Sequence, residues 1–264
     1  MPSKALMQAQ AGLKRIIKPY LAKGGVKPRR IHFGPGRGLY LMLNRENDLQ
    51  REFGLFEMEL HGTYRHLISP EDTVYDVGAA DGDTTVLFAK LVPRGRVVAF
   101  EPDQKQCGQL ARNLDLNPEL RNRVTVMRAF VGAQGDSRIG TNAPEAEPAP
   151  LVALDILVGQ ADVRPPDVVK IDVEGGEVEV LDGMKDILTN LQPRLVVEVH
   201  GVDRERECLD ILQKANYAVA IVNNARWRKL YPELRPVGHN RWLVAHPSRA
   251  FAATGQAQRT SGIR

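Results

Sequence analysis

The sequence has few cysteines and no long hydrophobic run, and each shortage excludes a class of protein. Its 264 residues include two cysteines, Cys107 and Cys208. They are too few for a disulfide framework and lack the CxxC spacing of a structural zinc site, so we expect a reducing, cytoplasmic environment. No segment approaches the ~20 consecutive apolar residues of a membrane span. Residues 1–25 also lack the apolar stretch of a secretory signal and instead suggest a basic amphipathic helix.

A large excess of one charge is also missing. The chain carries 36 Lys and Arg against 32 Asp and Glu, a net charge of +4. The basic residues form short clusters rather than one long tract, and a solvated surface explains them as well as a nucleic-acid site would. We therefore expect a small-molecule or saccharide partner and no nucleic acid, and we leave a homo-oligomer open.

From Val74 onward, short β-branched runs alternate with amphipathic helical segments. This alternation predicts an α/β protein with a mostly parallel sheet and helices on both faces. No helix separates the last two strands, so we expect a final hairpin that places one antiparallel strand in the sheet. The expected strands are 74–77, 96–100, 124–128, 167–172, 195–199, 217–222 and 241–245.

Composition divides the chain into three expected regions. Residues 1–70 are too few to bury a core alone and should form a helical cap, with a helix over 53–67. Residues 71–246 should form the main domain, with a surface loop at 140–150 that is rich in Ala and Pro. Residues 247–264 are expected to be a disordered tail.

Ligands of an open parallel sheet bind at the carboxyl ends of its strands. The first expected strand runs into DVGAADG, in which Gly78 permits a tight turn and Gly82 a close approach to a ligand. Glu101 directly follows the second strand, where a carboxylate can accept both hydroxyls of a ribose. These residues indicate a cofactor that contains adenosine.

The charges around this turn favour one such cofactor. A dinucleotide site needs GxGxxG, whereas the glycines here are spaced GxxxG, and Asp76, Asp81 and Asp83 would repel a diphosphate. S-adenosylmethionine carries a sulfonium and an ammonium and has no phosphate, so the same acids would attract it. A plain turn remains an alternative, with Asp81 or Asp83 capping the next helix.

Four motifs together resemble the FkbM family of S-adenosylmethionine-dependent methyltransferases. They are DVGAADGDTT at 76–85, FEPD at 100–103, KIDVEGGEVEVLDGM at 170–184 and VVEVHG at 196–201. The resemblance implies a seven-stranded class I methyltransferase fold and O-methylation, often of sugar or polyketide hydroxyls. Ala80 departs from the family, which often has Asn at that position.

The resemblance also implies a set of cofactor contacts. Asp76, Gly78 and Asp81 would surround the methionine moiety, Glu101 would bind the ribose, and Ala129–Phe130 would lie at the adenine edge. The full expected cofactor-binding set is Asp76, Gly78, Ala79, Asp81, Gly82, Glu101, Pro102, Ala129 and Phe130.

The expected catalytic residues are His200, Asp172 and Glu174, which follow neighbouring strands. His200 titrates in the range that suits a general base, and a nearby carboxylate would orient its ring. A purely structural His200 and a divalent cation held by these three residues are the alternatives. We expect no metal, because one histidine is available and hydrogen bonding also explains the acids. Glu177 is interpreted as a favourable charge at a helix start.

The sequence thus predicts an S-adenosylmethionine-dependent O-methyltransferase that acts on a hydroxyl of a saccharide or secondary metabolite. An NAD-linked oxidoreductase is one rival function. A cofactor-binding protein without methyl-transfer activity is the other. The sequence does not identify the acceptor.

Overall fold

The computed structural model describes residues 25–133, 149–161, 163–223 and 240–248. The predicted N-terminal helix, the core of the 140–150 loop and nearly all of the 247–264 tail lie outside the described residues. The chain divides into two compact units, Met1–Met58 and Glu59–Arg264, and each is described by itself. The regions 1–70, 71–246 and 247–264 remain predictions. Among the described residues, none of the helices combines the length and hydrophobicity needed to cross a membrane.

The described part of the first unit is a hairpin followed by a helix. Strand β1 (Val26–Arg30) pairs antiparallel with β2 (Tyr40–Asn44), and α2 (Arg45–Glu52) follows directly. The Asn44 side chain caps α2 by accepting the backbone N–H of Glu46 at 3.1 Å. The predicted helical cap did not include β1, because the sequence VKPRR shows no alternation of apolar and polar residues.

The predicted helix over 53–67 is wrong in its first half. Gly54 adopts a φ of +64°, and a Cβ atom there would lie 2.2 Å from the backbone oxygen of Phe33. The backbone therefore turns at this glycine instead of continuing as a helix. Helical structure resumes in a 3₁₀ turn, η1 (Met58–Leu60), and continues in α3 (His61–Leu67).

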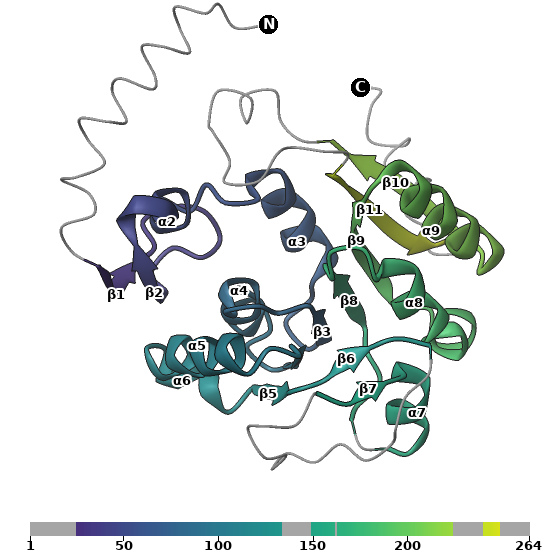
Figure 1. Ribbon diagram of the computed structural model, residues 1–264, viewed down its shortest axis with the longest axis horizontal. Coiled ribbons are helices and arrows are strands. Elements are labelled where there is room, and N and C mark those ends of the chain that lie inside the picture. The colour runs from purple at the N-terminus through teal and green to yellow at the C-terminus, as the bar shows by residue number, and fades with distance from the viewer. Residues whose placement is uncertain (1–24, 134–148, 162, 224–239, 249–264) are drawn as a thin grey trace, which may run out of the picture. The chain divides into compact units, whose positions relative to one another are not determined.

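The second unit contains a seven-stranded sheet, which confirms the predicted fold class (Figure 1). The strand order is β10-β11-β9-β8-β3-β4-β5. All neighbours pair in parallel except β11, which runs antiparallel to both β9 and β10 as the final hairpin requires. The strands are β3 (Thr73–Val77), β4 (Arg96–Phe100), β5 (Val124–Met127), β8 (Val168–Ile171), β9 (Arg194–His200), β10 (Tyr217–Val222) and β11 (Asn240–Pro247).

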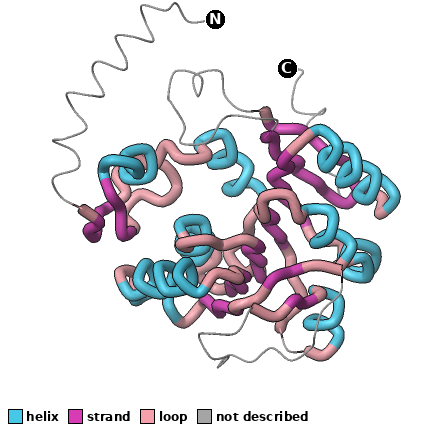
Figure 2. The backbone as a smooth tube through the Cα atoms, viewed as in Figure 1, coloured by secondary structure: helices cyan, strands magenta, loops and turns pink. Residues whose placement is uncertain are grey.

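Helices cover both faces of this sheet, as Figures 1 and 2 show. Helices α4 and α5 lie on one face and α8 and α9 on the other, and a short parallel pair, β6 with β7, lies near α7. Asp103 caps α5, since its side chain accepts the N–H of Gln106 at 2.8 Å. These elements are α4 (Asp83–Leu91), α5 (Gln104–Asp115), α6 (Pro118–Arg121), β6 (Phe130–Val131), β7 (Leu151–Val152), α7 (Leu154–Gly159), α8 (Glu177–Asp182), η2 (Ile187–Leu191) and α9 (Val202–Lys214).

Alternation along the strands separates an apolar core from a polar row. Tyr75, Ile171 and Val197 belong to the buried hydrophobic core that also contains Cys208 and Leu212 of α9. Successive side chains of a strand point to opposite faces. Asp76, Lys170 and Glu198 therefore point to the other face. The register places Asp76 directly beside Lys170.

A glycine ends the helix that begins at Glu177. Helix α8 ends at Asp182, and a π-helical turn, η2, follows from Ile187. A Cβ atom on Gly183 would lie 2.1 Å from the backbone oxygen of Gly132. The segment after β6 thus packs directly on the backbone at Gly183, a contact that local sequence patterns do not reveal.

Replacing this glycine should destabilise the fold. Gly183→Ala places a methyl group against backbone that cannot rotate away, and overpacking of this kind costs about 1–3 kcal/mol. Gly108→Ala is the matched control, since among the described residues the added Cβ meets no atom within 4 Å beyond the adjoining backbone of α5, and alanine favours a helix by about 1 kcal/mol. Urea unfolding measures both. Equal stability of Gly183→Ala and the wild type would contradict the packing described.

Candidate active site

The carboxyl ends of β3, β8 and β9 lie at the point where the strand order reverses. The chain leaves β3 for β4 on one side, whereas β8 pairs with the opposite side of β3. Open α/β sheets bind their ligands outside the carboxyl ends of the strands at such a position. The loops that follow these strands are therefore where a site is expected.

The loop after β3 is a tight turn held by neighbouring backbone. Gly78 and Ala79 both donate their N–H groups to the carbonyl of Phe100, at 2.9 and 3.0 Å. Gly78 has a φ of +82°, and a Cβ atom there would lie 1.8 Å from the carbonyl oxygen of Asp172. Gly82 has a φ of +83°, and its Cβ would lie 2.5 Å from the Leu110 side chain. Both glycines are thus required by the protein's own packing.

Glu101 ties this loop to the end of β4. One carboxylate oxygen accepts the N–H of Ala80 at 2.8 Å, and the other accepts the N–H of Asp103 at 2.8 Å. Burial raises the pKa of Glu101, while these two N–H groups oppose the rise. An ionised carboxylate offers about four acceptor positions. Glu101 therefore keeps acceptor capacity for ligand hydroxyls.

The other expected cofactor residues lie on the loops that follow β3, β4 and β5. Asp81 is half-buried, and its carbonyl accepts a hydrogen bond from the Asn113 side chain at 2.7 Å. Pro102 is half-buried beside Glu101, and Ala129 is buried. Phe130, at the start of β6, is 51% exposed. These residues share one edge of the sheet because parallel strands end at the same edge.

Asp76 differs from the rest of the set because its side chain is fully buried. One oxygen accepts the hydroxyl of Thr85 at 2.6 Å, and the other lies 3.6 Å from the Nζ atom of Lys170. Burial raises the pKa of Asp76, and Lys170 and Thr85 oppose this effect. Lys170 is itself only 4% exposed and lies 3.3 Å from the Asp172 carboxylate. Its ammonium group therefore bridges two acids on neighbouring strands.

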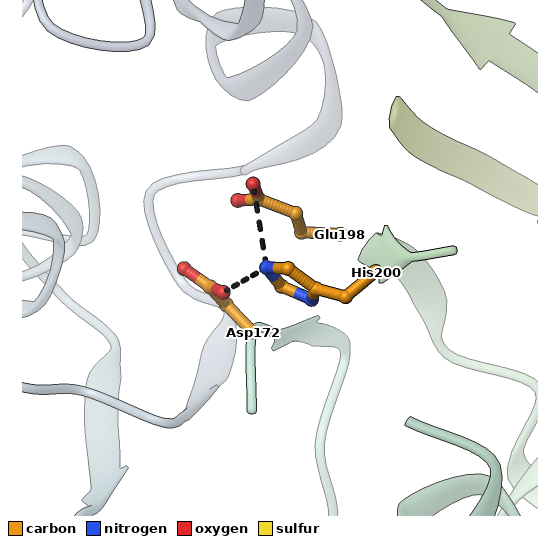
Figure 3. Close-up of side chains that lie close together, drawn as sticks. All are labelled: Asp172, Glu198 and His200. Carbon is orange, nitrogen blue, oxygen red and sulfur yellow. Dashed lines mark ion pairs between the residues drawn. The ribbon is translucent and has the colours of Figure 1, made fainter. Parts of the chain in front are cut away.

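His200 ends β9 beside three carboxylates. Its Nδ1 atom lies 2.7 Å from Glu177, and its Nε2 atom lies 3.9 Å from Asp172 and 3.8 Å from Glu198. Figure 3 shows Nε2 directed toward Asp172 and Glu198. The ring is 18% exposed. The hydrogen bond with Glu177 raises the pKa of His200, burial opposes it, and Glu198 and Asp172 add to the rise.

Two of these carboxylates have pKa values shifted in opposite directions, although burial acts to raise both. Burial acts to raise the pKa of Glu177, but hydrogen bonds from His200 and the N–H of Gly175 hold it below its ordinary value. Burial and the neighbouring Asp172 instead raise the pKa of Glu198. The Trp242 ring N–H donates to Glu198 at 3.1 Å.

Glu174 occupies a separate position on the loop after β8. It is exposed and adopts a φ of 51°, a left-handed conformation that is uncommon for residues other than glycine. Such conformations concentrate at functional sites.

Comparison with known proteins places the chain in a family. A family described as "Methyltransferase FkbM domain" matches residues 76–231. The chain belongs to the FkbM methyltransferase family. This membership confirms the predicted family and the prediction that the chain is a methyltransferase.

Two curated relatives of this FkbM chain are similar over part of their length. The Hexuronic acid methyltransferase AglP of Haloferax volcanii is 29% identical over 163 residues, which cover 57% of this chain and 65% of AglP. The AMB antimetabolite synthetase AmbE of Pseudomonas aeruginosa is 25% identical over 240 residues, which cover 70% of this chain and 11% of AmbE. The chain thus spans less than two thirds of either relative.

A solved FkbM methyltransferase from Methylobacillus flagellatus has a similar fold. The two structures superpose with a TM-score of 0.53 at 15% identity, covering 89% of this chain and 60% of the other. At 15% sequence identity, this structural similarity supports a shared fold and not a shared substrate.

Sequence reasoning missed three residues of this FkbM site. Lys170 and Glu198 each precede an expected catalytic residue by two positions, Asp172 and His200 respectively. That spacing places each pair on one face of its strand, a signal that could have identified both. Glu177 was interpreted as a helix-start charge, because its contact with His200 depends on the position of β9.

A divalent cation is an alternative ligand for part of this cluster. Asp172, Glu198 and His200 each offer one suitable atom, and these atoms all lie within 4.8 Å of one another. Lys170, however, already supplies a positive charge 3.3 Å from Asp172. The Nε2 atom of His200 also cannot hold a metal and accept a proton at the same time. The two roles of His200 therefore exclude each other, and a chelator distinguishes them.

The buried Lys170–Asp76 pair can be tested by a double-mutant cycle. Lys170→Met leaves the fully buried Asp76 without a countercharge, which should destabilise the fold by about 3–5 kcal/mol. Asp76→Asn combined with Lys170→Met removes both charges and should cost less than Lys170→Met alone. The loss should shrink as the pH falls, because Asp76 then takes a proton. Urea unfolding measures each variant, and strictly additive costs would contradict the pairing.

Proposed function

We propose that this FkbM domain is an S-adenosylmethionine-dependent O-methyltransferase that acts on a hydroxyl of a saccharide or related metabolite. The proposal rests mainly on His200, a partly exposed imidazole at the carboxyl edge of the sheet. Its Nε2 atom is directed toward Asp172 (Figure 3), whereas its Nδ1 atom contacts the buried Glu177. A nucleophilic hydroxyl needs a base in this kind of setting.

The charges of the cofactor edge support S-adenosylmethionine over a dinucleotide. Diphosphates bind the free N–H groups at a helix N-terminus. At the start of α4, the Asp83 carboxylate already accepts the N–H of Thr84 at 2.6 Å and would repel a phosphate. Asp81 and Glu101 add negative charge on the same edge. A cofactor with a sulfonium and an ammonium suits these groups.

The cofactor-binding residues that we propose keep the predicted set with one change of role. Gly78, Ala79, Asp81, Gly82, Glu101, Pro102, Ala129 and Phe130 would surround the cofactor. Asp76 would support the loop from below through Thr85 and Lys170, because its side chain has no exposed surface.

For methyl transfer, the protein has to position the two reactants and accept one proton. S-adenosylmethionine supplies, when bound, a methyl group activated by its sulfonium. The Nε2 atom of His200 would accept the proton of the acceptor hydroxyl, and the Asp172 carboxylate would orient that hydroxyl. Glu174 would contact the acceptor from the exposed loop. Alignment of the reacting groups supplies much of the acceleration.

The acceptor class is inferred from a relative and from charge. AglP is a hexuronic acid methyltransferase by name and is 29% identical to the aligned part of this chain. Asp172, Glu174 and Glu198 would repel the phosphates of a nucleic acid. A saccharide hydroxyl therefore fits better than a nucleotide.

Calorimetry separates this function from an NAD-linked oxidoreductase. The chain should bind S-adenosylhomocysteine with heat release and show none with NAD. Glu101→Gln should weaken the binding by about tenfold, since a neutral amide accepts ribose hydroxyls less strongly than a carboxylate does. Binding of NAD without binding of S-adenosylhomocysteine would contradict the proposal.

Methyl transfer can be followed with methyl-tritiated S-adenosylmethionine and methyl glycosides of glucose, galactose and glucuronic acid. His200→Ala should lower kcat about 10²–10⁴-fold, the usual contribution of a general base. Asp172→Asn should cause a smaller loss. The control is His66→Ala, an exposed histidine of α3 that contacts the Gly62 carbonyl.

Two results would change this assignment. Unchanged transfer in His200→Ala would remove His200 as the base. Transfer that stops with EDTA and returns with Mg²⁺ would favour the cation alternative over the base.

A further inference from the structure

The contact between Glu177 and His200 is the shortest one that the imidazole makes with its three neighbouring carboxylates. Glu177 begins α8, and its side chain has no exposed surface. Its Oε1 atom lies 2.7 Å from the Nδ1 atom of His200. The same oxygen accepts the N–H of Gly175 at 2.7 Å. The carboxylate is thus fixed from two sides by separate elements of the fold.

This arrangement decides which ring nitrogen carries the proton. An ionised carboxylate has acceptors only, so Nδ1 must donate. The lone pair of the neutral ring is then left on Nε2. Within the part of the chain that the structure describes, the other Glu177 oxygen, Oε2, is buried without a hydrogen bond. The hydrogen bond from His200 and those from the backbone N–H groups of Gly175 and Glu177 itself therefore favour the ionised carboxylate against burial.

The Nε2 atom lies near two carboxylates without a direct hydrogen bond to either. It lies 3.9 Å from Asp172 and 3.8 Å from Glu198, beyond the reach of a direct hydrogen bond to either. Both carboxylates lie on the same side of the ring (Figure 3). A hydroxyl could therefore donate to Nε2 while Asp172 holds the acceptor in place.

We propose that Glu177 is the positioning residue of the site, whose buried carboxylate keeps the His200 proton on Nδ1 and leaves Nε2 to accept the proton of the acceptor hydroxyl. The catalytic consequence rests on the proposed function, whereas the effect on the ring does not. When Nε2 takes the proton, the carboxylate stabilises the resulting imidazolium.

Stabilisation of the helix N-terminus by a negative charge does not explain why the Glu177 side chain is buried against His200. Stabilising a helix N-terminus requires only a carboxylate near the first turn, and such groups are normally exposed. Glu179, two residues later in α8, fits that simpler role: it is exposed and pairs with Arg204 at 3.1 Å. Glu179 is therefore the matched control for Glu177.

The same contact sets the pH dependence. The groups that face His200 are Glu177 from α8, Asp172 from the end of β8 and Glu198 from β9, with Lys170 behind Asp172. The three acids raise the pKa of His200 above its ordinary value of 6.5. Only the neutral ring accepts a proton, so kcat should fall as the pH drops through this raised pKa. Removing the Glu177 charge should move the fall to lower pH.

The test is NMR of the ring nitrogens in the full chain labelled with ¹⁵N-histidine, without any added donor or acceptor. In the wild type, His200 should carry its proton on Nδ1 and titrate above 6.5. Glu177→Gln keeps the size and one acceptor oxygen but removes the charge, and should lower the His200 pKa by about one unit or more. Glu179→Gln should leave it unchanged. His200→Gln assigns the signal.

Activity gives a second readout that a merely structural role would not produce. Glu177→Gln should lower kcat at least tenfold with KM for S-adenosylmethionine unchanged, and should shift the acid limb of the pH profile downward. A proton on Nε2 in the wild type, or a His200 pKa that Glu177→Gln leaves unmoved, would overturn the inference. Loss of S-adenosylhomocysteine binding would instead count against the proposed function, because the NMR result needs no ligand.

Discussion

The buried ammonium group of Lys170 is the constraint on which the site depends. Asp76 is fully buried in β3, and an ionised carboxylate in that position needs a nearby positive charge. Lys170 supplies it from β8, because the parallel register places the two residues side by side. A slip of one residue would turn Lys170 to the opposite face and leave Asp76 unpaired. The charge pair thus fixes the register of the two central strands as well as the electrostatics between them.

Asp172 joins the loop after β3, the proposed cofactor edge, to the proposed catalytic residue His200. Its backbone carbonyl packs against Gly78 of that loop, and its side chain pairs with Lys170 and faces His200. The His200 ring is held from its other side by Glu177. A methyl donor bound at the loop after β3 and an acceptor hydroxyl bound at Nε2 of His200 would therefore both lie next to Asp172. This arrangement suits a transfer reaction whose rate depends mainly on alignment.

Sequence patterns predicted the part of the structure that local chemistry determines. The seven strands and the final hairpin followed from hydrophobic alternation, and the glycine turn with Glu101 followed from residue type and spacing. The remainder depends on contacts between segments distant in sequence. Gly183 ends α8 because of the backbone at Gly132, and Gly82 faces Leu110, although its sequence-based explanation was a ligand. The role of Glu177 likewise depends on where β9 ends.

A crystal structure of the complex with S-adenosylhomocysteine tests the central claim most directly, because it locates the donor relative to His200. The account predicts that the ribose hydroxyls bind Glu101 and that the thioether sulfur lies open toward the Nε2 atom of His200, with Asp172 between the two regions. A cofactor bound away from the loop after β3, or one whose sulfur faces away from His200, would contradict it.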